Sequence, residues 1–393
     1  MRRIPGNTGA VMAVLLFLAA CAEPVPRAAP DGVELTPLKS YGAIESRVLL
    51  RLAGVSGIGV DHGVDCYRMI YRTRDAAGRE IMASGLLALP RDVTPKRLVS
   101  FQHGTTTSRD LVPSAPDGTG VAAAIVFAGN GYALVAPDYI GLGVSEEVHP
   151  YLVLEDAARA VIDMIAAARQ IDGVPDAPVF LSGFSQGGQA SLAALRALEA
   201  GGETVLGAAP VSSAYDIRNI SLGAALKGGA ESHALYLAYM ARGYAARYGQ
   251  PLDSALTPEY ATLAEDLFGN PHTPDEIIAA LPAEPRRMFN NAFLDAFDND
   301  GPHWLLAALA ENDISDWQPQ APVRLYYGEA DRDVVPEEAL HAERAMRARG
   351  ADAEAVNLGP HDHNGSMLEA APLILAWLSE LEAVAGRPEN GTP

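Results

Sequence analysis

Short apolar runs suited to buried strands alternate along the chain with longer stretches whose apolar residues recur at helical spacing. Runs of four to eight residues rich in Val, Ile, Leu and Tyr are typical of strands, and recurrence at i, i+3 and i+4 is typical of helices. The expected strands are 64–72, 81–89, 97–102, 131–137, 179–181, 205–211, 322–327 and 355–358. The expected helices are 155–171, 189–200 and 367–383. This alternation predicts an α/β domain with a mostly parallel sheet.

The first two strands are separated by Asp75-Ala-Ala-Gly78, which is a turn signal. Two strands joined by so short a connection pair with each other, and parallel neighbours would need a longer crossover. We therefore expect 64–72 and 81–89 to form an antiparallel hairpin, and we place it at the edge of the sheet.

Residues 215–317 carry little strand pattern, and an interval of this length is far beyond an ordinary connection. Thr257-Pro258 and Thr273-Pro274 place a capping residue and a first-turn proline at two helix starts, the second with Glu276 at capping-box spacing. Apolar and aromatic residues recur at helical spacing within it: Tyr236, Met240, Tyr244, Phe289, Phe293 and Phe297. The interval is interpreted as a helical cap inserted into the α/β domain.

The strand at 179–181 leads into Gly183-Phe-Ser185-Gln-Gly187, and a helical pattern follows at once. A serine on so sharp a strand-to-helix turn is held in strained backbone geometry, so the positions two before and two after it must be small. Gly183 and Gly187 meet that need. Free N–H groups at a helix N-terminus, including that of Gln186, can face a developing oxyanion. Ser185 is therefore the candidate nucleophile, and Gln186 a candidate oxyanion donor.

A serine nucleophile needs a base and a carboxylate that orients the base, and candidates for both lie downstream. Asp331 is the first aspartate after the strand end at Gly328, and Asp333 is the alternative. His363 lies close to the glycine-containing turn before the last helix, and His361 is the alternative base. A metal site on the two histidines would lack a third matched ligand cluster.

Several motifs together resemble the α/β-hydrolase superfamily and, within it, the bacterial relatives of the secretory lipases. The likeness covers roughly residues 64–383 and rests on Gln102-His103-Gly104-Thr105, Pro137-Asp138-Tyr139 with Gly141 and Gly143, the Ser185 turn, Gly328 with Asp331, and His363. It implies an α/β-hydrolase fold with a helical cap, and hydrolysis of carboxylic esters through an acyl-enzyme. It does not imply a particular substrate.

In this fold the second oxyanion donor is a backbone N–H in a loop after an early strand. Thr105 is preferred here and Thr106 is the alternative, while a plain glycine turn is the competing interpretation of the loop. His103, Asp138 and Tyr139 are interpreted as residues that hold loops in place. Ser185 would attack the ester carbonyl, His363 would accept its proton, and Asp331 would hold the imidazole. No cofactor is expected.

Two other functions remain open at this point. A serine peptidase of the prolyl-oligopeptidase type also carries Gly-x-Ser-x-Gly-Gly, although no propeller-like domain is evident in the sequence. A non-catalytic surface lipoprotein could use the same fold to bind a ligand. Nothing in the sequence points to a protein partner.

The N-terminus predicts export. Arg2 and Arg3 precede an apolar run at 11–20 that is too short to span a bilayer, as in a signal peptide. The run ends Leu18-Ala-Ala-Cys21, which resembles the lipobox of bacterial lipoproteins, whose cysteine is lipidated. Cys21 is therefore the candidate lipidation site of a membrane-anchored cell-envelope lipoprotein that faces the periplasm or the surface. The alternative is an ordinary signal cleaved nearby.

Processing would remove two arginines and no acid, so the formal net charge would move from −20 to −22. A strongly acidic surface argues against nucleic acid and anionic lipid headgroups as partners. It favours neutral substrates or a purely solubilising surface. Cys66 would be the one remaining thiol, and its apolar alternating surroundings predict a buried strand residue.

The expected organisation joins these elements into six segments. They are a signal peptide at 1–21, a flexible tether rich in Pro and Ala at 22–40, a first core part at 41–214, the cap at 215–317, a second core part at 318–385 and a tail at 386–393.

Overall fold

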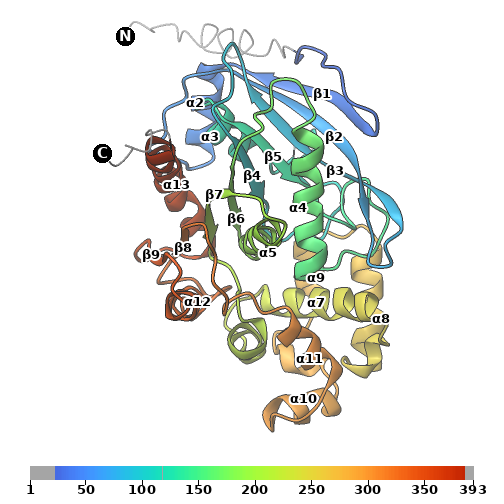
Figure 1. Ribbon diagram of the computed structural model, residues 1–393. Helices are drawn as coiled ribbons and strands as arrows, with labels where there is room; N and C mark the ends of the chain where they lie inside the picture. The colour runs from blue at the N-terminus through green and yellow to red at the C-terminus, as the bar shows by residue number, and fades with distance from the viewer. Residues whose placement is uncertain (1–22, 117, 386–393) are drawn as a thin grey trace, which may run out of the picture.

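A computed structural model describes residues 23–116 and 118–385. Within that part of the chain, one nine-stranded sheet runs through the molecule in the order β1-β2-β3-β5-β4-β6-β7-β8-β9 (Figure 1). The strands are β1 (Val33–Tyr41), β2 (Val64–Arg74), β3 (Glu80–Pro90), β4 (Leu98–Gln102), β5 (Ala133–Pro137), β6 (Val179–Phe184), β7 (Val205–Val211), β8 (Val323–Tyr327) and β9 (Ala353–Asn357). Every expected strand is present, and the sheet is parallel from β5 to β9.

The N-terminal edge of the sheet differs from the expectation. The hairpin of β2 and β3 forms as predicted, but β1 pairs antiparallel with β2 and takes the edge position. Val33–Tyr41 therefore belongs to the sheet, and the tether expected over 22–40 is shorter. Pro37 made this segment look unstructured, yet an edge strand tolerates a proline at a register shift, and one occurs between Pro37 and Lys39.

Helices cover both faces of the sheet, which explains why its central strands are continuously apolar. Val179 and Leu181 of β6 point to one face, while Phe180 between them points to the other. The first face is covered by α4 (Leu154–Ala168), α5 (Gln186–Ala200) and α12 (Glu337–Ala348). The second is covered by α2 (Ala43–Leu52), α3 (Val121–Ala128) and α13 (His363–Ala385). α4, α5 and α13 were expected, whereas α2, α3 and α12 were not.

The interval between β7 and β8 is helical (Figure 1). Its apolar side chains form a cluster of buried residues that Tyr151 and Val153 also join. Its elements are a π-helical turn η1 (Ile217–Ser221), α6 (Leu222–Lys227), α7 (His233–Tyr248), η2 (Leu252–Ser254), α8 (Pro258–Gly269), α9 (Pro274–Ala280), η3 (Pro285–Met288), α10 (Asn291–Asp298) and α11 (Trp304–Glu311). Thr257 caps α8, and Thr273 caps α9 with the predicted capping box to Glu276. Both predicted helix starts are therefore confirmed.

A buried carboxylate fixes the point where this helical segment leaves the sheet. Glu338 of α12 accepts hydrogen bonds from the N–H groups of Tyr215 and Asp216, each at 2.8 Å, and from the Ser221 hydroxyl at 2.5 Å. Burial raises the pKa of Glu338 to about 7, against the effect of these donors. The Tyr215 carbonyl also accepts from the N–H of Ile314 at 2.9 Å, so the segment's two ends are held together.

Cys66 lies in β2 with its side chain buried, as predicted, and burial raises the pKa of its thiol to about 12. No helix in 23–116 or 118–385 is both long enough and apolar enough to cross a membrane. The expected signal peptide, its Cys21 and the tail at 386–393 lie outside the described residues.

Candidate active site

Ser185 lies at the turn between β6 and α5, as the glycine pattern predicted. Its backbone has φ of 54° and ψ of −120°, a region that non-glycine residues rarely occupy. A Cβ on Gly183 would overlap the Gly187 carbonyl, and a Cβ on Gly187 would overlap the Gln102 carbonyl. The two glycines are therefore required because strand, helix and the neighbouring β4 meet here. Ser185 is buried, with 8% of its surface exposed.

Asp331 and His363 are brought together by the ends of two other elements. Asp331 lies in the loop after β8, and His363 is the first residue of α13. His363 Nδ1 lies 2.8 Å from Asp331 Oδ2, and both side chains are buried. A carboxylate accepts at that distance, so Nδ1 carries the proton and Nε2 remains as an acceptor. The other Asp331 oxygen, Oδ1, accepts from the N–H groups of Asp333 and Val334, each at 3.0 Å.

His363 also lies beside the serine turn, because its ring centroid is 4.6 Å from that of Phe184, the residue before Ser185. The side chains of the alternative residues have other partners. The His361 side chain is 38% exposed and lies 4.0 Å from Glu369, and Asp333 accepts a hydrogen bond from Ser232. Of the four candidates, the structure pairs only Asp331 with His363.

Both candidate oxyanion donors are tied to one short segment, His149-Pro-Tyr151. The Gln186 side-chain nitrogen lies 2.8 Å from His149 Nε2, and His149 Nδ1 lies 2.6 Å from the Ile140 carbonyl. The Thr105 hydroxyl bonds the Tyr151 hydroxyl at 2.7 Å. Burial lowers the pKa of His149 to about 4, so its ring is neutral at pH 7 and can accept from Gln186 through Nε2.

His149 and Tyr151 were not among the site residues expected from the sequence. The available signal was their position after the loop at 138–143, since loops that follow parallel strands line such sites. The backbone N–H groups of Thr105 and Gln186 donate to no loop or side-chain acceptor within the described residues. They remain available to an incoming oxygen.

The residues interpreted as loop supports have that role in the structure. Asp138 is buried and accepts from the Ser84 hydroxyl at 2.6 Å and from the Ser114 hydroxyl at 2.5 Å. The Tyr139 hydroxyl donates to the His103 carbonyl at 3.0 Å, and the two rings stack at 4.4 Å. Burial lowers the pKa of His103 to about 4, which leaves it neutral.

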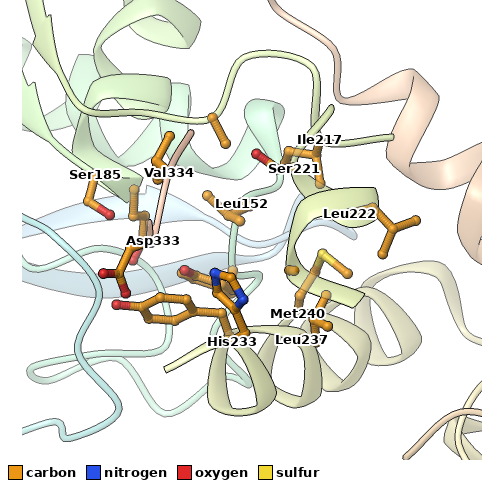
Figure 2. A pocket seen from close by; sticks show the side chains of 15 residues that line it. Leu152, Ser185, Ile217, Ser221, Leu222, His233, Leu237, Met240, Asp333 and Val334 are labelled. Atoms are coloured by element: carbon orange, nitrogen blue, oxygen red, sulfur yellow. The ribbon is translucent and has the colours of Figure 1, made fainter. Parts of the chain in front are cut away.

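A cavity opens at Ser185 beneath the helical segment, and we call it the cap cavity. Figure 2 shows Ser185, Asp333 and Val334 on one side of it and Leu222, Leu237 and Met240 on another. Its walls come from the turn after β6, from the loop after β8 and from η1, α6 and α7. Most of the lining side chains are apolar: Leu152, Ala214, Ile217, Leu222, Ala225, Leu237, Met240 and Val334. In the described part of the chain, no cluster of three or more His, Cys, Asp or Glu residues could hold a metal ion.

Comparison with known proteins finds one matching family model and several solved structures with a similar fold. Residues 121–220 match the secretory lipase family. A candidate hydrolase from Legionella pneumophila is 26% identical with a TM-score of 0.80, and the alignment covers 94% of this chain and 100% of that one. Comparison with curated protein sequences finds no significant match.

Two further solved structures share the fold. The rice cell wall degrading esterase LipA from Xanthomonas oryzae is 24% identical with a TM-score of 0.74, over 91% of this chain and 98% of LipA. Candida antarctica lipase A in its closed state is 15% identical with a TM-score of 0.69, over 92% of this chain and 84% of the lipase. The chain therefore has the α/β-hydrolase fold, and over residues 121–220 it is similar to the secretory lipases.

Proposed function

We propose that this protein is a serine hydrolase that cleaves carboxylic esters through an acyl-enzyme on Ser185. The observation that carries the proposal is the buried hydrogen bond between Asp331 and His363 beside the strained Ser185 turn. The similarity to secretory lipases and the fold shared with an esterase and a lipase support ester hydrolysis. The geometry of the site supports serine as the nucleophile.

The proposed reaction follows from the hydrogen bond between His363 Nδ1 and Asp331 Oδ2. His363 Nε2 accepts the Ser185 proton as the hydroxyl oxygen attacks the ester carbonyl, and Asp331 stabilises the imidazolium that forms. The N–H groups of Gln186 and Thr105 would then donate to the oxyanion. His149 and Tyr151 act as positioning residues because they hold the side chains of these two donors. Collapse of the oxyanion breaks the bond to the alcohol oxygen, and His363 Nε2 gives its proton to the departing alcohol. Water then attacks the acyl-enzyme as His363 Nε2 accepts its proton, and the acid leaves as that proton returns to Ser185. No cofactor takes part in any of these steps.

The apolar cap cavity favours a neutral ester over a peptide. An extended peptide needs partners for its backbone N–H and carbonyl groups, whereas the cavity wall offers mainly aliphatic side chains. We propose that the cap at 215–317 selects the substrate by enclosing one apolar substituent of the ester and by excluding water. A prolyl-oligopeptidase-like peptidase is the alternative reaction on the same triad.

A panel of p-nitrophenyl esters and the matching p-nitroanilides tests the proposed reaction. Esters of short and medium acids should be hydrolysed far faster than the anilides of the same acids. Among the esters, kcat/KM should rise with acyl length until the cavity is full. Each added methylene should lower the activation free energy for kcat/KM by about 0.8 kcal/mol or less. Equal kcat/KM for short and medium esters would contradict the proposal that the cap selects the substrate. Better turnover of proline-containing peptides would favour the peptidase.

We also propose that the protein is exported and anchored through a lipidated Cys21, on the strength of the basic and apolar N-terminal pattern. Acyl chains on the mature N-terminus would hold the acidic domain at a membrane without a transmembrane helix. Mass spectrometry of the protein from the membrane fraction should find an acylated peptide that begins at Cys21. An unmodified N-terminus beyond Cys21 on active protein in the soluble fraction would contradict the anchor.

A further inference from the structure

The chain that precedes β1 is held against the domain, although a flexible tether was expected there. The Val25 carbonyl accepts a hydrogen bond from the Tyr67 hydroxyl at 2.9 Å. The Arg27 side chain donates to the same hydroxyl at 3.3 Å and to the Asp172 carbonyl at 3.0 Å. Because Tyr67 is a buried residue of β2, these bonds tie the segment to the sheet.

Very little chain remains between this fixed segment and the proposed lipid anchor. Three residues separate Val25 from Cys21, and the four residue steps between them span at most about 14 Å when fully extended. A lipidated Cys21 would therefore keep the Val25 end of the domain close to the membrane surface.

The fixed segment leaves the domain in the direction away from the candidate active site. β3 pairs antiparallel with both β2 and β5, so β2 runs in the same direction as the parallel strands. Val33 pairs with Tyr71 toward the end of β2, whereas Val25 contacts Tyr67 nearer its start. Followed back from Val33, the chain thus runs toward the end of the molecule where the parallel strands begin, which we call the base. Figure 1 shows the blue segment before β1 reaching the end of the molecule opposite α10 of the cap.

The candidate active site lies at the other end of the sheet. Ser185, Asp331 and His363 follow the ends of β6, β8 and β9, and parallel strands end on the same side of a sheet. The cap covers the site at that end (Figure 1). The base and the cap are therefore separated by the whole length of the strands.

The connection to Cys21 is too short to bring the cap to the membrane. β2 alone continues from Tyr67 to Arg74 toward the cap end, which at about 3.3 Å per residue is about 23 Å. The four steps from Val25 to Cys21 are shorter than this distance, and the chain at Val25 already runs toward the base. A Cys21 held in a bilayer therefore does not allow the cap to face that bilayer.

We propose that the anchored protein stands with its base at the membrane and with its active site opening away from that membrane. The proposal rests on the acylation of Cys21 and the ester hydrolysis proposed above, and it adds the source of the substrate. Esters that arrive through the aqueous phase reach Ser185, whereas lipids of the anchoring bilayer do not.

Energy transfer from a label on the protein to a dye in the membrane tests the orientation. Val93→Cys places the label at the base, in the exposed loop between β3 and β4, and Ala292→Cys places it on the exposed face of α10 in the cap. Cys66 is buried, so a maleimide dye labels the introduced cysteine alone. The acylated proteins are reconstituted from detergent into phosphatidylcholine vesicles that contain a rhodamine lipid.

Transfer from the label at Val93→Cys should exceed transfer from the label at Ala292→Cys by at least about twofold, because a strand of six residues alone separates the two ends by about 20 Å. Equal transfer, or greater transfer from the cap, would overturn the orientation. Thermal unfolding shows separately that both labelled proteins are folded.

A longer connection provides the matched variant. A Gly-Ser linker of about twenty residues between Ala22 and Glu23 adds a root-mean-square reach of about 25 Å, so the difference in transfer between the two labels should shrink. An unchanged difference would overturn the short connection as the cause of the orientation.

The source of the substrate is tested with one ester in two places. A fluorogenic diacylglycerol is added either to the vesicles that hold the protein or, in equal amount, to protein-free vesicles mixed with them. The ester in the protein's own bilayer should be hydrolysed no faster than the ester in the separate vesicles, and p-nitrophenyl butyrate should be hydrolysed as fast as by the protein in detergent. Faster hydrolysis within the protein's own bilayer would overturn the proposal.

These measurements separate the orientation from the reaction and from the anchor. If p-nitrophenyl butyrate is not hydrolysed but the label at the base transfers more, the proposed reaction fails and the orientation stands. If butyrate is hydrolysed and the two labels transfer equally, the orientation fails and the reaction stands. An unacylated Cys21, detected by mass spectrometry, would overturn the orientation together with the anchor and leave the reaction in place.

Discussion

Ser185→Ala should lower kcat for p-nitrophenyl butyrate by at least about 10³-fold, because a methyl group cannot attack the carbonyl. The elbow geometry would remain, since alanine retains the Cβ that already fits at φ of 54°. KM should change little, because the cap cavity and the oxyanion donors are untouched. Steady-state kinetics of the purified protein measures both constants.

A matched control is Ser213→Ala, which removes another buried serine hydroxyl near the same turn. Ser213 packs against Gly188 of α5, and its hydroxyl has no partner within the described residues. Activity should be retained in this variant. An alkyl fluorophosphonate should add its mass to the unmutated protein and to Ser213→Ala but not to Ser185→Ala. Near-normal hydrolysis or labelling of Ser185→Ala would rule out the proposed nucleophile.

The central sheet could be predicted because its strands are buried on both faces. Such strands are short continuous apolar runs, and 179–181 and 205–211 were recognised for that reason. The Ser185 turn could be predicted because a steric requirement acts on single residues, and only glycine fits at 183 and 187. Continuous apolar runs and sterically required glycines can therefore be recognised from the sequence alone.

The edge strand β1 and the helices α2, α3 and α12 were not predicted from the sequence. β1 contains Pro37 and alternates partly buried with exposed residues, so its composition resembles a linker. α12 is rich in charge, and only Ala339, Ala342 and Met346 form its apolar contact with the sheet. Whether such a segment forms a strand or a helix depends on its packing against the rest of the protein. The preferences of its single residues do not predict that packing.

The supports of the candidate site could not be predicted because they depend on contacts between distant residues. His149 meets Gln186 across 37 positions, and Tyr151 meets Thr105 across 46. Which aspartate pairs with which histidine also depends on a contact between residues far apart in the sequence. Sequence position favours Asp331 over Asp333 and His363 over His361 without excluding the alternatives. In the structure, the approach of the loop after β8 to the start of α13 pairs Asp331 with His363.

The hydrogen bond between His363 and Asp331 leads to a second prediction, a large loss of kcat in His363→Ala. Removing the imidazole leaves Ser185 without a base, so kcat for p-nitrophenyl butyrate should fall by about 10³-fold or more. His361→Ala should retain activity within a small factor, because its ring lies toward Glu369 and makes no contact with Asp331. Kinetics of the two single variants under one set of conditions makes the comparison.

Asp331→Asn and Asp333→Asn extend the same comparison to the acid. An amide at 331 cannot stabilise the imidazolium and favours the wrong tautomer, so a loss of about 10⁴-fold in kcat is expected, as for the corresponding change in a serine protease triad. Asp333 bonds Ser232 instead of His363, so its variant should lose far less. Loss of activity in His361→Ala or Asp333→Asn, with His363→Ala and Asp331→Asn active, would reverse the assignment. Such a reversal would require the loop at 328–336 and the start of α13 to rearrange when substrate binds, because the hydrogen bond from His363 to Asp331 would have to break first.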